Sequence, residues 1–312
     1  MSEILIVAPF AAHIAARIGS VPAGLGLAIA ESFDQTGLSL SEVRALITLP
    51  QMLDQALLER MPKLEWLQTL TAGIDPLAGL DLSGIALSTM GGVYAPQMSE
   101  LAFLYMLAFA RDVRGILARQ AAAEWRISPP HLLAGAHAVI VGVGRIAEAL
   151  ARRCQAFDMP VTGVSGSRRE APGFNQVVPL DRLTATAGSA DYLIVLAPYS
   201  PQNHHLVSRA VIAALPPTAV LINIARGPVV DEAALIEALS EKRIAGAGLD
   251  VFVQEPLPPD HPFWRMPNVI VTPHIGGWST RLVEQMTPVI AENLGRWFAS
   301  PRRPLINQAF PS

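Results

Sequence analysis

The chain has 312 residues, of which 51% are hydrophobic and 16% are charged, and its formal net charge is −3. This length suits two domains with large buried cores, and the small negative charge argues against a partner that is nucleic acid or an anionic membrane. The single cysteine, Cys154, excludes an intrachain disulfide and suits a reducing compartment, so we expect a cytoplasmic protein. We see no basic targeting region at the start, and the longest apolar helical run is too short to cross a bilayer.

The first hundred residues alternate short apolar runs with helix-like segments, which predicts a parallel α/β sheet. Expected strands cover residues 4–7, 45–49, 64–70 and 85–89, with a helix over 52–60. The loop T-A-G-I-D, residues 71–75, follows the third of these strands. Backbone N–H groups in such a loop can bind an anion, although a plain tight turn explains the same residues.

Residues 100–119 are predicted to form one long helix with a broad apolar surface, which suits a subunit interface. The second unit then begins near His137, and the last helix, near 280–299, is expected to return to the first unit. Further strands are expected at 138–141, 161–164, 192–196, 220–224, 247–251 and 269–271. We therefore predict two doubly wound parallel-sheet α/β domains of the Rossmann/flavodoxin-like kind with an interdomain cleft: a discontinuous substrate domain (1–97 and 281–312) and a dinucleotide-binding domain (98–280).

A dinucleotide-binding turn is predicted at the start of the second unit. The apolar run Ala138 to Val141 ends at Gly142, Gly144 follows two residues later, and a helix-like pattern begins with Arg145 and Ile146. Glycines allow close approach of a pyrophosphate, and the first N–H groups of a helix bind its charge. The third position of the fingerprint is Ala147, which the close helix–strand packing there tolerates. Cys154 lies in the same helix, where a buried apolar role is more typical than a reactive thiol.

The residues after the second strand of this unit favour NADP(H) over NAD(H). An acidic residue that bonds the ribose 2′-hydroxyl is expected there, but Ser165 occupies the position, and Ser167, Arg168 and Arg169 follow. A serine and two guanidinium groups can bind a 2′-phosphate, which a carboxylate would repel. The alternative is that both arginines are solvated surface residues, which leaves NAD(H) open.

Three later strands are followed by stretches that supply the candidate ionisable side chains Arg226, Glu255 and His274. A 2-keto acid needs a cation for its carboxylate and carbonyl oxygen, which Arg226 can supply. Its developing alkoxide needs a proton, which a histidine can give near neutral pH. A carboxylate such as Glu255 can orient that histidine. Of the other histidines, His204 and His205 are adjacent, and neighbouring residues seldom converge on one ion, so no metal site is expected.

These motifs together resemble the D-isomer-specific 2-hydroxyacid dehydrogenase family over nearly the whole chain. They include T-A-G-I-D, L-I-N-I-A-R-G-P-V-V-D, L-D-V-F-V-Q-E-P and N-V-I-V-T-P-H-I-G-G. The resemblance implies that His274 is the proton donor in reduction, Glu255 its partner, and Arg226 the residue that binds the keto acid. It further implies that Ala72 and Gly73 hold the substrate carboxylate, that Asp250 bonds the nicotinamide carboxamide, and that the protein is a homodimer. The remaining expected cofactor contacts are Pro198, Ala225, Gly276 and Gly277.

The serine–arginine replacement after the second strand resembles the NADPH-preferring glyoxylate/hydroxypyruvate reductase branch of the family. The segment 91–98 is not typical, so the size of the substrate stays open, and Tyr94 and Trp278 can each be pocket or packing residues. A competing interpretation is a dinucleotide-sensing corepressor on the same fold, because fold alone does not fix function. The complete set of Arg226, Glu255 and His274 favours the enzyme.

Overall fold

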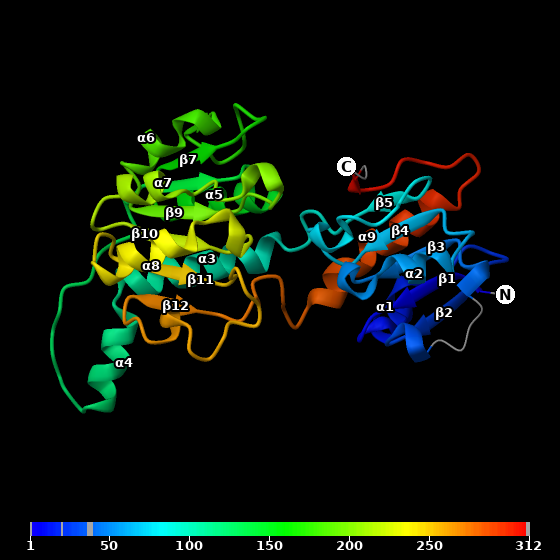
Figure 1. Cartoon of the computed structure of the whole chain (residues 1–312), viewed down its shortest axis with the longest axis horizontal. Helices are drawn as coiled ribbons and strands as arrows, with labels where there is room; N and C mark the ends of the chain where they lie inside the picture. The colour runs from blue at the N-terminus through cyan, green and yellow to red at the C-terminus, as the bar shows by residue number, and fades with distance from the viewer. Residues whose placement is uncertain (1, 20, 36–39, 310–312) are drawn as a thin grey trace. The chain divides into compact units, whose positions relative to one another are not determined.

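The computed structural model describes residues 2–19, 21–35 and 40–309. The chain divides into two compact units, Met1–Tyr94 with Ser279–Ser312 and Ala95–Trp278. Each unit is built around one predominantly parallel sheet with helices on both faces (Figure 1). The two-domain α/β architecture expected from the alternating strands and helices is thereby confirmed.

The sheet of the first unit has the strand order β13-β5-β4-β3-β1-β2. Within it, the order β2-β1-β3-β4-β5 is that of flavodoxin-like doubly wound sheets. Its strands are β1 (Ser2–Val7), β2 (Gly26–Ala30), β3 (Ala45–Thr48), β4 (Trp66–Thr69), β5 (Ala86–Ser88) and β13 (Gln308–Ala309). The edge strand β13 pairs antiparallel with β5, which the purely parallel pattern expected for this unit did not include.

Helices cover the two faces of this first sheet. α2 (Gln55–Glu59) packs on one face through Leu57 and Leu58. On the other face, the ring of Trp297 in α9 (Leu282–Trp297) lies 5.9 Å from that of Trp66. α1 (Ala11–Ile18) packs beside α9. The last helix of the chain therefore belongs to the sheet formed by the first strands.

The second unit holds a seven-stranded parallel sheet in the order β12-β11-β10-β9-β6-β7-β8. Its strands are β6 (Ala138–Val141), β7 (Val161–Val164), β8 (Gln176–Val178), β9 (Tyr192–Val195), β10 (Val220–Asn223), β11 (Gly246–Leu249) and β12 (Val269–Val271). The strand order reverses between β6 and β9, and ligands of such sheets bind at the carboxyl ends of the strands beside that point. The glycine turn after β6 lies at this reversal.

Helices cover both faces of this second sheet as well. α3 (Ala95–Ala110) and α5 (Arg145–Ala156) share a core with one face. The other face is covered by α6 (Leu183–Ala187), α7 (Arg209–Ala214) and α8 (Glu232–Ser240). α3 lies so close to β11 that a Cβ at Gly248 would come within 2.5 Å of the Tyr105 ring. Glycine at this position therefore lets α3 pack against the strand.

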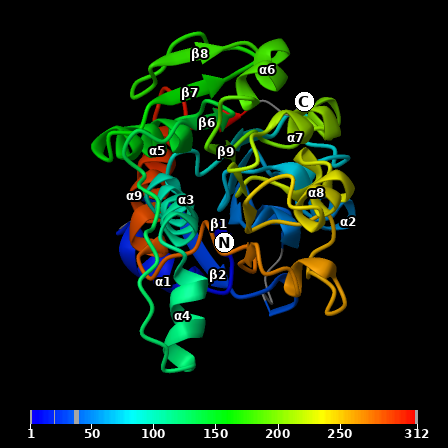
Figure 2. The same ribbon diagram turned by 90° about the vertical axis from the view of Figure 1, so that its left-hand side faces the viewer.

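The single helix expected over residues 100–119 is wrong. α3 ends at Ala110 and α4 (Val113–Ala121) begins after Asp112, whose φ of 49° is left-handed. The Asp112 carboxylate accepts a hydrogen bond from the Gly115 N–H at 3.1 Å, so it caps the new helix. α4 extends away from the sheet of its unit (Figures 1 and 2).

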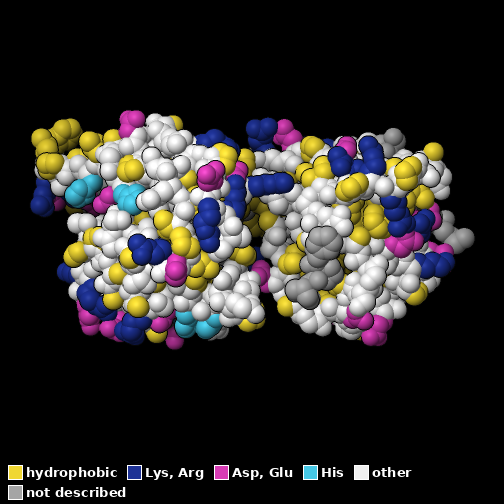
Figure 3. Space-filling model, turned by 90° about the horizontal axis from the view of Figure 1, so that it is seen from above, with side chains coloured by type: hydrophobic (Ala, Val, Ile, Leu, Met, Phe, Trp, Pro, Cys, Tyr) yellow, Lys and Arg dark blue, Asp and Glu magenta, His cyan; other side chains and the backbone are white. Residues whose placement is uncertain are grey.

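No helix among the described residues has both the length and the apolar character that crossing a membrane requires. On the face shown in Figure 3, basic and acidic side chains are intermixed over both units. The surface in this view therefore carries charge of both signs in close proximity.

Candidate active site

The glycine turn after β6 leaves the N-terminus of α5 accessible. Gly142 has a φ of +97°, and a Cβ there would lie 2.5 Å from the backbone nitrogen of Ala197, so only glycine fits. Gly144 is the N-cap of α5 and makes no side-chain cap hydrogen bond. A Cβ at Gly144 would meet nothing within 4 Å, so open space lies over the helix start. This site therefore fits the pyrophosphate of a dinucleotide. Arg145 and Ile146 form the first turn of α5, with Arg145 exposed and Ile146 half-buried.

The residues expected to meet a 2′-phosphate follow β7. Ser165 is buried, and its hydroxyl accepts hydrogen bonds from the N–H groups of Arg168 at 3.1 Å and Ser167 at 3.4 Å. The Arg168 Nη1 donates to Glu148 Oε1 at 2.6 Å, whereas Arg169 Nη1 donates to the carbonyl oxygens of Ser165 and Arg168. Arg168 therefore points toward α5, and Arg169 folds back onto its own loop.

Asp250, at the end of β11, fixes the segment that carries His274. Its side chain is 1% exposed. The carboxylate accepts hydrogen bonds from the N–H groups of Ile275 at 2.9 Å and Gly276 at 2.8 Å, and from the Thr272 hydroxyl. The Tyr105 hydroxyl contacts the Thr272 hydroxyl at 2.5 Å. The contact of Asp250 with a nicotinamide carboxamide stays a prediction.

His274 and Glu255 form a direct pair. The imidazole Nδ1 lies 2.6 Å from Glu255 Oε2, and Glu255 Oε1 accepts the Phe252 N–H at 3.0 Å. His274 has a left-handed φ of 52°, which is uncommon for a residue other than glycine, and its N–H donates to the Asp250 carbonyl at 2.9 Å. The pair is half-exposed, so a ligand from solvent can reach it.

The pKa of Glu255 lies below its ordinary value. Burial by itself would raise this pKa, but the hydrogen bonds from His274 and from the Phe252 N–H outweigh it, together with the charges of His274 and Arg226. Glu255 is therefore a carboxylate at neutral pH. This negative charge lies beside Nδ1 of His274 and can hold the imidazole ring in one orientation.

Arg226 follows β10 in a loop that packs directly against the loop of Glu255. A Cβ at Gly227 would lie 2.0 Å from the backbone carbon of Phe252, so the two backbones are in contact there. The Arg226 Nη1 donates to the Ala225 carbonyl at 2.7 Å, and the Asn223 side chain donates to the Arg226 carbonyl at 3.0 Å. The structure thus holds Arg226, Glu255 and His274 on neighbouring loops at the carboxyl ends of β10, β11 and β12.

The other predicted residues occupy the following places. Pro198 is exposed after β9, and its carbonyl accepts the Asn203 side chain at 3.1 Å, while the Gly277 carbonyl accepts Gln97 Nε2 at 3.0 Å. In the first unit, the Thr71 hydroxyl donates to the Gly73 carbonyl at 2.6 Å. Among the described residues, no hydrogen-bond partner is present for the N–H groups of Ala72 and Gly73. Both can therefore donate to an anion.

The structure also places the residues whose roles the sequence left open. Tyr94 is buried and its hydroxyl donates to the Leu70 carbonyl, which suits a packing residue, whereas Trp278 is 60% exposed. Burial raises the pKa of the Cys154 thiol to about 12, which agrees with a buried residue and not with a reactive one. The His204 and His205 rings stack at 3.9 Å, and the described residues contain no cluster of three potential metal ligands.

Sequence reasoning missed Glu148, Thr272 and Tyr105. Glu148 lies in the first turn of α5, and nothing in its sequence neighbourhood indicates a partner 20 residues away in the chain. Tyr105 lies in an apolar helix and reads as core. The one sequence signal for its role was the hydroxyl group, because a buried tyrosine hydroxyl usually has a hydrogen-bond partner.

Comparison with known proteins identifies the family. The family model described as "D-isomer specific 2-hydroxyacid dehydrogenase, NAD binding domain" matches residues 103–276. The chain belongs to the D-isomer-specific 2-hydroxyacid dehydrogenase family. It is therefore a nicotinamide-dependent oxidoreductase of 2-hydroxy acids, and the non-catalytic sensor is not favoured.

Named relatives match most of the chain. A glyoxylate/hydroxypyruvate reductase B of Yersinia enterocolitica is 35% identical over 82% of this chain and 81% of its own length. A hydroxyphenylpyruvate reductase of Plectranthus scutellarioides is 33% identical over 81% of this chain and 80% of its own length. The NADPH-dependent glyoxylate/hydroxypyruvate reductase of Sinorhizobium meliloti, solved with NADP and sulfate, has a TM-score of 0.85 and 26% identity, and covers 99% of this chain and 98% of its own.

Proposed function

We propose that this member of the family reduces a small 2-keto acid, glyoxylate or hydroxypyruvate, with NADPH as the preferred reductant. The observation that carries the proposal is the His274–Glu255 pair with Arg226 on the adjacent loop, at the same sheet edge as the open glycine turn. General acid catalysis needs a histidine with one nitrogen held and the other available. Here Glu255 holds Nδ1, which leaves Nε2 to exchange a proton with the substrate.

Arg226, His274 and Glu255 each have a separate role in the proposed reduction. A nicotinamide dinucleotide held at the glycine turn would supply the hydride for this reduction. Arg226 binds the substrate's carboxylate or carbonyl oxygen by charge-assisted hydrogen bonds. His274 gives its Nε2 proton to the oxygen that becomes the hydroxyl, and Glu255 orients the ring through Nδ1. The N–H groups of Ala72 and Gly73 are assigned to the substrate carboxylate as part of this proposal.

The preference for NADP(H) rests on the residues after β7. Ser165 stands where a carboxylate would repel a 2′-phosphate, and its hydroxyl orders the turn that carries Arg168. Support also comes from the relative of Sinorhizobium meliloti, which was solved with NADP. We expect Arg168→Ala to weaken the binding of NADPH more than that of NADH. Equal weakening of the two would contradict the assignment of Arg168 to the 2′-phosphate.

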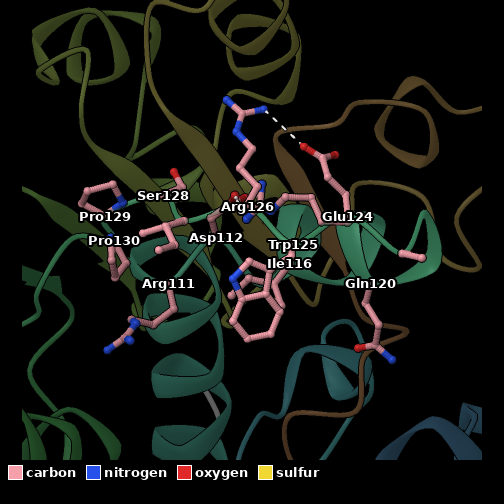
Figure 4. Close-up of a pocket in the computed structure, with 13 residues that line it drawn as sticks. Arg111, Asp112, Ile116, Gln120, Glu124, Trp125, Arg126, Ser128, Pro129 and Pro130 are labelled. Atoms are coloured by element: carbon pink, nitrogen blue, oxygen red, sulfur yellow. Dashed lines mark hydrogen bonds and ion pairs between the residues drawn. The ribbon is translucent and has the colours of Figure 1, made fainter.

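A homodimer in the cytoplasm is also part of the proposal. α4 and the segment after it expose apolar side chains, with Trp125 96% and Ile127 88% exposed. They line a hollow of about 660 Å³ together with Ile116, Arg111 and Glu124 (Figure 4). Exposed apolar patches of this kind mark protein interfaces, and charges of both signs beside them suit a self-complementary contact.

The test is a spectrophotometric assay at ~340 nm, where reduced nicotinamides absorb and their oxidised forms do not. Glyoxylate, hydroxypyruvate, pyruvate and phenylpyruvate are each supplied with NADPH and with NADH. We expect the highest kcat/KM with NADPH and one of the first two acids. Preference for the aromatic acid would overturn the proposed substrate and keep the mechanism. Binding of NADPH without turnover of any acid would overturn the proposed enzyme activity.

A further inference from the structure

Glu148 forms an ion pair with Arg168, the residue assigned to the 2′-phosphate. It lies in the first turn of α5, and its Oε1 is 2.6 Å from Arg168 Nη1. The Glu148 side chain is 21% exposed and that of Arg168 38%. A half-buried pair is screened less by salt than a fully exposed one. The carboxylate of Glu148 therefore lowers the positive electrostatic potential around Arg168.

The pair engages only one part of the guanidinium group. Arg168 Nη1 donates to Glu148 and, at 3.4 Å, to the Val143 carbonyl. Among the described residues, no partner contacts Arg168 Nε or Nη2. These two nitrogens form one edge of the guanidinium, which can bind two oxygens of a phosphate. Glu148 thus orients Arg168 and leaves its binding edge accessible.

The same carboxylate also opposes the anion that this edge would bind. A 2′-phosphate on Arg168 carries more than one negative charge and would meet a guanidinium whose charge Glu148 already offsets. Arg169, the other cation of the loop, donates Nη1 to the carbonyl oxygens of Ser165 and Arg168. The phosphate therefore meets less net positive charge than the two arginines suggest, because Glu148 offsets one of them.

We propose that Glu148 is a specificity-determining residue that limits the preference for NADPH over NADH. It holds Arg168 in position, and its negative charge reduces the affinity for the 2′-phosphate. NADH has no phosphate at this position, so its affinity is unaffected by Glu148. This inference rests on the proposed NADP(H) preference.

Two substitutions separate the charge of Glu148 from its hydrogen bond. Glu148→Gln removes the charge and keeps an oxygen that can accept from Arg168 Nη1. Glu148→Ala removes both. Glu237→Gln is the matched control, because Glu237 is also ion-paired, with Arg209 at 2.6 Å and Arg243 at 2.7 Å, but lies on α8. All variants are measured as the full chain by titration calorimetry with 2′,5′-ADP, 5′-AMP, NADPH and NADH.

We expect Glu148→Gln to bind 2′,5′-ADP and NADPH about three- to fivefold more tightly, the scale of one partly screened charge pair. Its affinities for 5′-AMP and NADH should stay at the wild-type values, and Glu237→Gln should change none of the four. The gain should shrink in ~1 M salt, where the Debye length is about 3 Å. Glu148→Ala should gain less than Glu148→Gln, because Arg168 loses its orienting partner.

The outcomes distinguish this inference from the function on which it rests. One outcome is that Arg168→Ala weakens the binding of 2′,5′-ADP while Glu148→Gln leaves that binding unchanged or weaker. This result would refute the role of Glu148 and leave the NADP(H) proposal standing. Equal tightening of 5′-AMP and 2′,5′-ADP would place the effect on the pyrophosphate side and refute the specificity role. If the wild-type protein binds both nucleotides equally and Arg168→Ala changes neither, the NADP(H) preference itself fails.

Discussion

His274 is held through one ring nitrogen and through its backbone N–H. Its Nδ1 faces Glu255, and its N–H donates to the carbonyl of the buried Asp250. We expect His274→Ala to lower kcat by about 10²- to 10⁴-fold, the usual contribution of general acid catalysis. The dissociation constant of NADPH, measured by fluorescence titration, should change little.

A second variant separates proton transfer from the backbone conformation. Asparagine adopts left-handed φ values more readily than alanine, so His274→Asn preserves the conformation of the loop better. Both variants should be equally inactive if His274 is the proton donor. Recovery of activity in His274→Asn alone, or equal loss of turnover and NADPH binding, would contradict that role.

Glu255 makes the stability of the protein depend on pH in a defined direction. Its pKa in the folded chain lies below the ordinary value of 4.5. The ionised carboxylate therefore stabilises the fold above about pH 4.5, and this contribution is lost as the pH falls through the lowered pKa.

Glu255→Gln tests this dependence. We expect the variant to be less stable than wild type at pH 7, with a difference that narrows steadily below pH ~4.5. Urea unfolding monitored by tryptophan fluorescence at pH 7, 5, 4 and 3 measures it. A difference that stays constant over this range would show that the carboxylate's ionisation does not contribute to stability.

At the level of single residues, the sequence predicted side chains whose type matches their chemistry. Arg226, Glu255 and His274 each follow a strand of the second sheet. Partners that act through space were not predictable, because Glu148 meets Arg168, and Tyr105 meets Thr272, across loops of unrelated sequence. The direction of the Arg168 side chain depends on such a partner.

Two loops at the ends of β10 and β11 depend on one glycine. Gly227 lies against the Phe252 backbone, and rotation of a side chain cannot relieve an overlap with backbone atoms. Gly227→Ala must therefore displace the loop of Arg226, the loop of Glu255, or both. Overpacking costs about 1–3 kcal/mol, which corresponds to a loss of roughly 2–10 °C in Tm. We also expect kcat/KM to fall by at least about tenfold, since catalysis is sensitive to small misplacements.

Gly295→Ala is the matched control for this experiment. Gly295 lies inside α9, and a Cβ there would meet nothing within 4 Å. Alanine favours a helix over glycine by about 0.8–1 kcal/mol, so Tm should stay the same or rise. The Tm of both variants is measured by differential scanning calorimetry, and their kcat/KM by the spectrophotometric assay. Wild-type activity in Gly227→Ala would refute the coupling of the two loops.

At the level of elements, the long periodic segments were predictable and the edges were not. α8, α9 and the buried strands follow clear apolar patterns, whereas β2, β8 and β13 were not expected. β13 has only two residues and gains its partner β5 from far away in the chain. The break between α3 and α4 was missed because the apolar pattern continues across it. The aspartate at 112 that caps α4 was the available signal.

The whole molecule is proposed to be a dimer through α4 and the segment that follows it. Wild type should have twice the chain mass of 33.3 kDa in sedimentation velocity at micromolar concentration. Leu117→Arg should shift it to the single-chain mass, because an unpaired guanidinium in an apolar contact is unfavourable. Leu117 is 57% exposed on α4.

Ile29→Arg is the control for the dimer experiment. Ile29 is an apolar residue, 45% exposed, on β2 of the first unit. This variant should keep the mass of wild type. A wild-type mass of 33.3 kDa would refute the dimer, and dissociation by Ile29→Arg as well would show that the effect is not specific to α4.

At the scale of the whole chain, the fold class followed from alternation of strands and helices, which two packed α/β layers require. The family followed from several ordered motifs. The choice of substrate did not, because pocket shape depends on side chains from many loops whose conformations a linear pattern does not contain. Two relatives illustrate this point, because they are nearly equally identical to this chain but are named for different acids. One is named for the small acids glyoxylate and hydroxypyruvate, and the other for the aromatic acid hydroxyphenylpyruvate.

The burial of Cys154 has a practical consequence. It is the only thiol of the chain, it is fully buried in α5, and its pKa is raised to about 12, so a disulfide reagent at pH 8 can modify it only when α5 detaches. The rate of labelling therefore reports how often the helix beneath the pyrophosphate site opens. A dinucleotide bound at the start of α5 should protect the thiol, and the degree of protection as the nucleotide is titrated would give its affinity without substrate or turnover.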